Sequence, residues 1–112
     1  MKVLLVEDEA LVAMMIEDML TDLGHQVVGP AMHLDAGLEL AASADLDFAV
    51  LDMNLRGESS TPIADVLQRR QVPFVFATGY GSRGRTLGAH QGVEIVTKPF
   101  DARQLARAIT RT

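Results

Sequence analysis

Short, continuously apolar runs alternate along the chain with longer stretches in which apolar residues recur every three or four positions. The short runs are Val3–Val6, Gln26–Val28, Phe48–Leu51, Phe74–Ala77 and Val93–Val96. An apolar run without a polar face is typical of a strand in a parallel sheet that helices cover on both sides. The pattern therefore predicts five strands, each buried on both faces.

The longer stretches predict four helices. The apolar stripe of the first helix is formed by Val12, Ile16, Met19 and Leu23. Gly24 follows this stripe, where a left-handed cap is expected. The remaining helices are expected over residues 34–42, 62–70 and 102–110. Strands that alternate with helices through right-handed crossovers predict one α/β domain over residues 1–112, with a doubly wound parallel sheet.

The segment from Gly79 to Gly92 differs from the rest of the chain because it holds five of the nine glycines. Glycine has a low helix propensity, so a helix in this segment would have little intrinsic stability. We therefore expect a frayed or mobile element between the last two strands.

Polar residues follow four of the five expected strands. They are Glu7-Asp8, Asp52, Thr78 and Lys98-Pro99. A single aspartate after a strand is most often a helix cap or a turn former. The carboxyl ends of parallel strands share one edge, however, and three carboxylates gathered there repel one another. Lys98 supplies only one positive charge, so the set predicts a hard divalent cation, Mg²⁺ or Mn²⁺, with oxygen ligands.

The same residue types suit phosphoryl transfer to a carboxylate. Asp52 is the candidate nucleophile and also a metal ligand, and Glu7 and Asp8 are the other candidate ligands. Charge that develops on the phosphoryl oxygens requires cationic and neutral donors already in place. We expect Lys98 to contact one of these oxygens and Thr78 another.

At this point the chain resembles a response-regulator receiver domain of two-component signalling, over essentially its whole length. The resemblance rests on Glu7-Asp8, Asp52, Thr78 and Lys98. The intervals are 44 residues from Asp8 to Asp52, 26 from Asp52 to Thr78 and 20 from Thr78 to Lys98. The resemblance implies a flavodoxin-like fold with strand order 2-1-3-4-5 and a cis peptide between Lys98 and Pro99. It also implies that Asp52 accepts phosphate from a histidine kinase or histidine phosphotransferase, and that the backbone carbonyl of Asn54 joins the metal ligands.

The run from Phe76 to Gly81 is similar to a narrower receiver subgroup, common in alphaproteobacteria and marked by Phe-Ala-Thr-Gly-x-Tyr. Here Tyr80 follows Gly79 directly. Such receivers occur alone or fused to kinases, and often work with kinases of the HWE type. The resemblance implies that Asn54 and Tyr80 influence the lifetime of the phosphoryl group, although a turn asparagine and a half-buried ring are equally good readings.

Ile95 departs from the pattern of many receivers, which have Tyr or Phe three residues before the lysine. Ile95 has no hydroxyl and no ring, so the usual coupling between a threonine and an aromatic side chain cannot operate in its standard form. We hypothesise that the segment 79–92 responds directly to movement of Thr78, with Tyr80 as the reporting ring.

Composition and charge limit the classes of partner that the chain is expected to bind. The chain is 48% hydrophobic and 22% charged, with a formal net charge of −5. Residues 1–55 carry −10 and residues 56–112 carry +5. Without a basic field a nucleic acid or an anionic membrane is not an expected partner. No apolar run exceeds seven residues, and neither cysteine nor a signal-peptide pattern occurs, so we expect a cytoplasmic protein.

Two apolar residues, Leu11 and Met14, fall outside the stripe of the first helix and lie close to the expected site in sequence. They are candidates for a surface that contacts the kinase, although scattered apolar residues on a surface are common. Arg103, Arg107 and Arg111 repeat every four residues along the last helix. A solvated face is the favoured interpretation of this stripe, and contact with an acidic partner is the second.

The function expected from the sequence is that of a stand-alone phosphoacceptor that switches a surface for a downstream protein effector. Alternatives are a carrier or sink of phosphate in a relay, and the C-terminal domain of a hybrid kinase. An Asp-nucleophile phosphatase is more distant, because Asn54 occupies the place of the general acid. A flavin-binding protein is also distant, because the run from Glu7 to Glu9 would repel a phosphate. We expect no enzyme beyond the chain's own phosphorylation and dephosphorylation.

Overall fold

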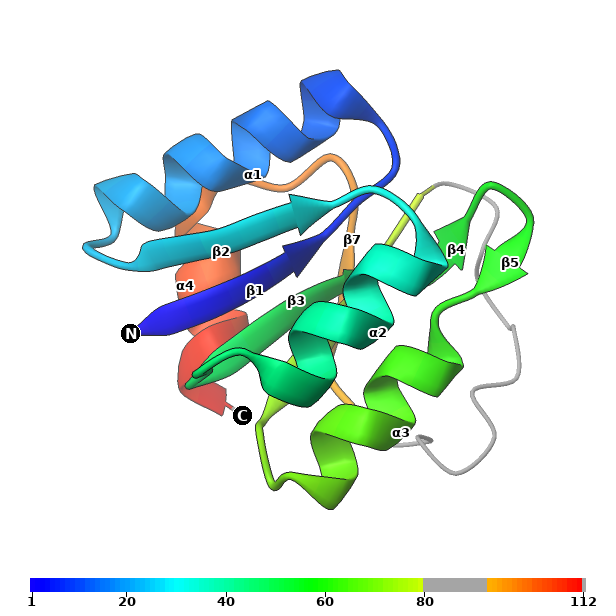
Figure 1. Cartoon of the computed structure of the whole chain (residues 1–112). Coiled ribbons are helices and arrows are strands. Elements are labelled where there is room, and N and C mark those ends of the chain that lie inside the picture. The colour runs from blue at the N-terminus through cyan, green and yellow to red at the C-terminus, as the bar shows by residue number, and fades with distance from the viewer. Residues whose placement is uncertain (80–92, 112) are drawn as a thin grey trace.

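The computed structural model of the chain describes residues 1–79 and 93–111. Its helices are α1 (Ala10–Asp22), α2 (Leu34–Ser43), α3 (Thr61–Arg69) and α4 (Ala102–Arg111). Its main strands are β1 (Lys2–Val6), β2 (Gln26–Ala31), β3 (Phe48–Asp52), β6 (Phe74–Thr78) and β7 (Ile95–Thr97). These five strands form one parallel sheet in the order β2-β1-β3-β6-β7 (Figure 1). The expected order 2-1-3-4-5 and the flavodoxin-like α/β fold are confirmed.

Two hydrophobic layers cover the sheet, one on each face. Successive side chains of a strand point to opposite faces, so Val3 and Leu5 of β1 contribute to one layer and Leu4 and Val6 to the other. The first layer includes α1 and α4, and the second includes α2 and α3, which lie side by side in Figure 1. The three central strands are therefore apolar on both faces, as the sequence predicted, except at the terminal residues Lys2, Asp52 and Thr78.

The prediction that every strand is buried on both faces is wrong for the two edge strands. In β2 Gln26 is exposed and its neighbours are half-buried, and in β7 Ile95 is 41% exposed. An edge strand has only one neighbouring strand, so the helix layers cover it less completely. The last strand also begins at Ile95 rather than Val93, because its ladder with β6 starts at the Phe76–Ile95 pair.

The expected stripe of α1 is shifted. The buried residues are Ala13, Ile16 and Leu20, whereas Val12 and Met19 lie at the margin of the contact with the sheet. A small alanine lets the helix backbone approach the strands closely, a preference that a pattern of large apolar residues does not show. The cap of α1 is confirmed, because Gly24 has a φ of 89° and its amide donates to the Thr21 carbonyl at 2.9 Å.

The other helices begin and end within about one residue of the expected positions. A short antiparallel hairpin of β4 (Asn54–Leu55) and β5 (Glu58–Ser59) follows β3 and was not expected. Tyr80 and nearly all of the glycine-rich segment lie outside the described residues, so the hypotheses about them stay predictions. In the described ranges, every helix falls short of the length and apolar character that crossing a membrane requires.

Candidate functional site

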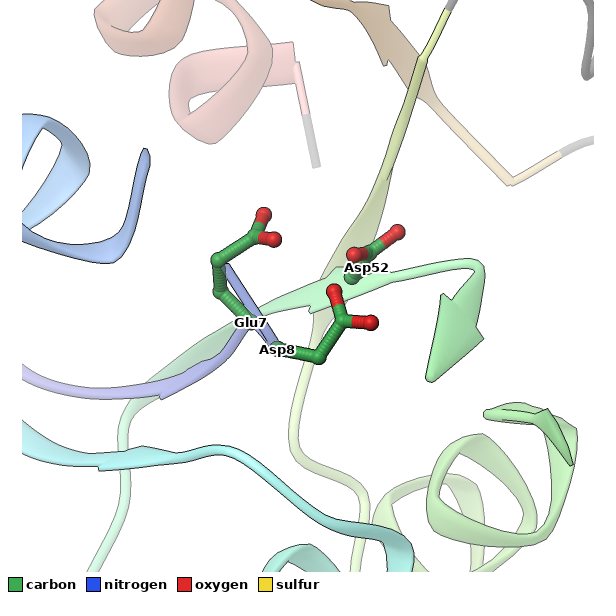
Figure 2. A group of neighbouring side chains, drawn as sticks. All are labelled: Glu7, Asp8 and Asp52. Atoms are coloured by element: carbon green, nitrogen blue, oxygen red, sulfur yellow. The ribbon is translucent and has the colours of Figure 1, made fainter. Parts of the chain in front are cut away.

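Three acidic side chains meet at the carboxyl edge of the sheet. Glu7 and Asp8 follow β1, and Asp52 is the last residue of β3. One carboxylate oxygen from each lies within 4.8 Å of the others, and Figure 2 shows the three side chains converging. Strands β1 and β3 are parallel neighbours that end at the same level, with Val6 opposite Leu51, which brings these residues together. The sequence-predicted cluster is therefore present.

The backbone around the cluster is fixed by the sheet. The amide of Glu7 donates to the Ala31 carbonyl of β2 at 2.9 Å, and the amide of Met53 donates to the Ala77 carbonyl of β6 at 3.0 Å. Both bonds continue the sheet one residue past the strand ends. The side chain of Glu7 is fully buried and Asp52 is 7% exposed, so two of the three acids are held in a largely desolvated place.

Among the residues that the structure describes, Lys98 brings a positive charge to these acids. Its Nζ lies 2.5 Å from Oε1 of Glu7 and 3.3 Å from Oδ2 of Asp52. Its amide donates to the Thr78 carbonyl at 2.7 Å, and the Lys98–Pro99 peptide is cis, as the resemblance implied. The sequence predicted Lys98 as a phosphoryl contact, and the structure shows in addition that Glu7 holds it.

Within residues 1–79 and 93–111, the one lysine at this edge does not balance the charge of the three acids. Burial raises the pKa of Asp52 to about 7, the Lys98 ammonium opposes this rise, and the Glu7 carboxylate adds to it. Burial works against the charged form of Lys98 as well, but the hydrogen bond to Glu7 and the charge of Asp52 outweigh it and raise the pKa of Lys98. The protein without a cation therefore holds a proton on Asp52 through much of the range below neutral pH.

Asp8 lies at the margin of the cluster and is half-buried. Its Oδ2 accepts a hydrogen bond from the amide of Arg56 at 3.0 Å. Burial alone would raise the pKa of Asp8, but hydrogen bonds from the Asp52 side chain and the Arg56 amide lower it. The sequence analysis did not predict this contact.

Thr78 ends the strand next to Asp52, and Asn54 follows Asp52 two residues later. Thr78 ends β6, is 6% exposed, and donates from Oγ1 to the carbonyl of Gly79 at 3.3 Å. The amide of Asn54 lies 3.3 Å from Oδ1 of Asp52, and its side-chain Oδ1 accepts from the amide of Gly57 at 2.7 Å. Asn54 therefore contacts Asp52, and Thr78 ends the neighbouring strand one residue after the partner of Asp52. Ile95 lies exposed on the edge strand.

The donor set fits a hard divalent cation. Carboxylate oxygens are the ligands that Mg²⁺ and Mn²⁺ prefer, and three of them converge here. Burial, together with the Glu7 carboxylate, raises the pKa of Asp52, and a divalent cation at the cluster would favour the ionised form. Receiver domains bind Mg²⁺ at an acidic pocket of this kind.

An apolar surface lies next to the site. Leu11 is 71% and Met14 59% exposed on α1, and Met15 is also exposed. A groove of about 430 Å³ runs between α1 and the segment after β7, lined by Met15 and Phe100 among others and reaching Lys98. The sequence-predicted exposure of Leu11 and Met14 is confirmed, and Met15 extends the surface.

A doubly wound parallel sheet with three acids, a threonine and a lysine at its carboxyl edge defines the receiver class of signalling domains. The chain belongs to the family named response regulator receiver domain, which matches residues 3–110. Phosphate acceptance on an aspartate is general to this family.

The chain is similar to several alphaproteobacterial regulators among the solved structures and curated proteins. The solution structure of SdrG from Sphingomonas melonis Fr1 has a TM-score of 0.87 and 39% identity, covering 97% of this chain and 92% of SdrG. The anti-anti-sigma factor PhyR from Bartonella quintana has a TM-score of 0.84 and 31% identity, covering 98% of this chain and 46% of PhyR. The phyllosphere-induced regulator PhyR of Methylorubrum extorquens is 29% identical over 113 residues, which are 98% of this chain and 42% of PhyR. The chain therefore spans less than half the length of these PhyR proteins.

Proposed function

We propose that the chain is a phosphoacceptor receiver in which Asp52 takes a phosphoryl group from a phosphohistidine. The observation that carries this proposal is the convergence of three carboxylates, with Lys98 against two of them, at one end of a buried sheet. Such an arrangement destabilises the fold unless a cation and a phosphoryl group use it. We propose that Glu7, Asp8, Asp52 and the backbone carbonyl of Asn54 hold the cation, with Mg²⁺ as its simplest identity and Mn²⁺ as the alternative.

In the reaction an oxygen of the Asp52 carboxylate forms a bond to phosphorus while the bond from phosphorus to the donor nitrogen breaks. The electron pair of that bond stays on the imidazole of the donor. A bound cation would neutralise charge on the phosphoryl oxygens and favour ionised Asp52. Lys98 would move from Asp52, which it contacts at 3.3 Å, to one phosphoryl oxygen. Thr78 follows Ala77, which pairs with Asp52 between β6 and β3, and its Oγ1 would turn from the Gly79 carbonyl to another phosphoryl oxygen.

We propose that the chain promotes only its own phosphorylation and dephosphorylation and turns over no separate substrate. Asn54 stands where a phosphatase with an Asp nucleophile needs an acid, and its side chain is occupied by the Gly57 amide. An amide cannot protonate a leaving group. The flavin alternative fails on charge, because the loop after β1 carries Glu7, Asp8 and Glu9 and offers no phosphate cradle.

We propose that the kinase or phosphotransferase binds the surface formed by Leu11, Met14, Met15 and the groove beside Phe100. This surface is apolar, exposed and adjacent to Lys98, which is where a donor histidine must arrive. A kinase of the HWE type agrees with the Phe-Ala-Thr-Gly run. We expect the chain in the cytoplasm. There it would act in a relay, as a sink of phosphate or as the switch for a protein effector. A receiver at the end of a hybrid kinase remains the alternative.

The test is the mass of the intact protein after incubation with a small phosphodonor such as phosphoramidate. We expect a gain of one phosphoryl group that requires Mg²⁺, that hydroxylamine removes, and that the variant Asp52→Asn does not show. Asparagine keeps the shape of the side chain but is a poor nucleophile. A gain in both proteins, or in neither, contradicts the assignment of Asp52.

A further inference from the structure

The turn that joins β4 to β5 has an unusual backbone. Arg56 and Gly57 form its two central positions, with φ of 54° and 90° respectively. Positive φ at both positions is the geometry of a type I′ hairpin turn, which suits glycine and asparagine far better than arginine. The side chain of Arg56 is exposed, so no packing of that side chain compensates for this backbone.

The left-handed backbone of Arg56 has a consequence for the acidic site. Its amide donates to Oδ2 of Asp8 at 3.0 Å, across 48 residues of sequence. Two further contacts hold the turn, the bond from the Gly57 amide to the Asn54 side chain at 2.7 Å and the pairing of Leu55 with Glu58. A strained turn that is held by its neighbours and aimed at a functional carboxylate indicates a role for that strain.

We infer that the Arg56–Gly57 turn positions the Asp8 carboxylate for the cation, through the backbone amide of Arg56. This inference rests on the proposed function. The hydrogen bond fixes one oxygen of Asp8 and leaves the rest of the carboxylate for the cation. Partners behind a ligand set its orientation, and their loss typically weakens metal binding about 10- to 100-fold. Because the donor is a backbone amide, the conformation of the turn matters and the charge of the Arg56 side chain does not.

Two glycines allow a matched test of this inference. Gly57 and Gly24 have nearly the same φ, 90° and 89°, and a Cβ added at either would have no atom within 4 Å. Alanine at either position therefore disfavours the local backbone without a clash. Gly57→Ala disturbs the turn that contacts Asp8, whereas Gly24→Ala disturbs the cap at the far end of α1.

The experiment is calorimetric titration of the full chain and both variants with Mg²⁺, together with their thermal unfolding midpoints. We expect Gly57→Ala to bind Mg²⁺ about 10-fold more weakly and Gly24→Ala to bind within about twofold of the unsubstituted chain, while both lower the midpoint by similar amounts. Equal Mg²⁺ affinity in Gly57→Ala and Gly24→Ala overturns the inference. Absence of Mg²⁺ binding in the unsubstituted chain overturns the proposed function itself, and the inference with it.

A second pair keeps the test decisive if Gly57→Ala fails to fold. Arg56→Gly and Arg56→Val both remove the guanidinium, but glycine adopts positive φ freely and valine strongly disfavours it. We expect Arg56→Gly to bind Mg²⁺ at least as tightly as the unsubstituted chain and Arg56→Val several-fold more weakly than Arg56→Gly. Equal affinity in this pair shows that the backbone of the turn has no positioning role.

Discussion

The carboxyl edge of the sheet and the core directly below it are both largely buried but have opposite effects on stability. Leu4, Leu5 and Val6 of β1 are fully buried, and so is Glu7, the next residue. Burial of the three apolar side chains stabilises the fold, at roughly 25 cal/mol per Å² removed from water. Burial of a carboxylate beside two others destabilises it. The core therefore supplies the free energy of folding, and the buried acids of the edge lower it. The fold tolerates this loss of stability in order to hold the site.

The largest effect is expected in the core. Phe76 of β6 is fully buried and packs edge-on against Phe74 with a centroid separation of 5.6 Å. We expect Phe76→Ala to lower the free energy of unfolding by about 3–5 kcal/mol, equally with and without Mg²⁺. Urea denaturation measures this. A loss below about 1 kcal/mol would show that the core is not the source of stability.

The next effect separates a buried ion pair from an exposed one. Lys98→Met leaves Glu7 and Asp52 without their cation, and we expect a loss on the order of 2 kcal/mol in the absence of Mg²⁺. This is below the usual loss for a buried pair because Asp52 can take up a proton instead. The matched control is Lys2→Met, which breaks an exposed pair of 2.9 Å with Asp45.

We expect Lys2→Met to leave the free energy of unfolding nearly unchanged, because an exposed ion pair contributes little to stability. Equal losses in the two lysine variants would contradict the idea that the edge is held by Lys98. Chemical denaturation at pH 8 with a chelator present gives both values under one condition.

The pH dependence tests the raised pKa of Asp52. In the folded chain that pKa is about 7, above its ordinary value of 3.8, so the folded state binds more protons than the unfolded state between these values. The contribution of Asp52 to stability is therefore fully present below about pH 4, falls as the pH rises, and is lost above about pH 7. The lowered pKa of Asp8 acts in the opposite sense at low pH, so a difference between variants is needed.

The difference in unfolding free energy between the unsubstituted chain and Asp52→Asn isolates this term. Without Mg²⁺, we expect Asp52→Asn to gain in relative stability as the pH is raised from 4 to 7 and to level off above it. Midpoints measured at intervals of pH provide the curve. A difference that does not vary with pH would mean that Asp52 titrates as it does in the unfolded chain.

The smallest effect is expected on the exposed surface of α1. Leu11 and Met14 are mostly exposed, so the double variant Leu11→Ser/Met14→Ser should change the free energy of unfolding by less than about 0.5 kcal/mol. Phosphorylation by a small phosphodonor should also stay unchanged. A loss above about 1 kcal/mol would assign these residues to the core rather than to a partner surface.

Most of the fold could be predicted from the sequence, because the hydrophobic pattern of the central strands differs in period from that of the helices. Strand ends then placed Glu7, Asp8, Asp52 and Lys98 at one edge, and their contacts confirm it. The exposure of the edge strands could not be predicted from the hydrophobic pattern. An apolar residue such as Ile95 fits this pattern equally well in an edge strand and in a central strand.

The hairpin after β3 was missed for a different physical reason. Its turn places Arg56 in a left-handed conformation that arginine does not favour, so local propensity argues against the observed structure. The contact that holds it, from the Arg56 amide to Asp8, joins residues far apart in sequence and involves no side chain of Arg56. A contact made by a backbone amide does not depend on the type of residue, so the sequence contains no pattern that predicts it.

The central claim is that the acidic edge lowers stability until a cation occupies it. The most direct measurement is the thermal unfolding midpoint of the unsubstituted chain and of Asp52→Asn at pH 8, each with a chelator and with saturating Mg²⁺. The account predicts that Asp52→Asn is the more stable protein without Mg²⁺, and that Mg²⁺ stabilises the unsubstituted chain much more than the variant. It is contradicted if Asp52→Asn is the less stable protein without Mg²⁺ and Mg²⁺ raises both midpoints equally.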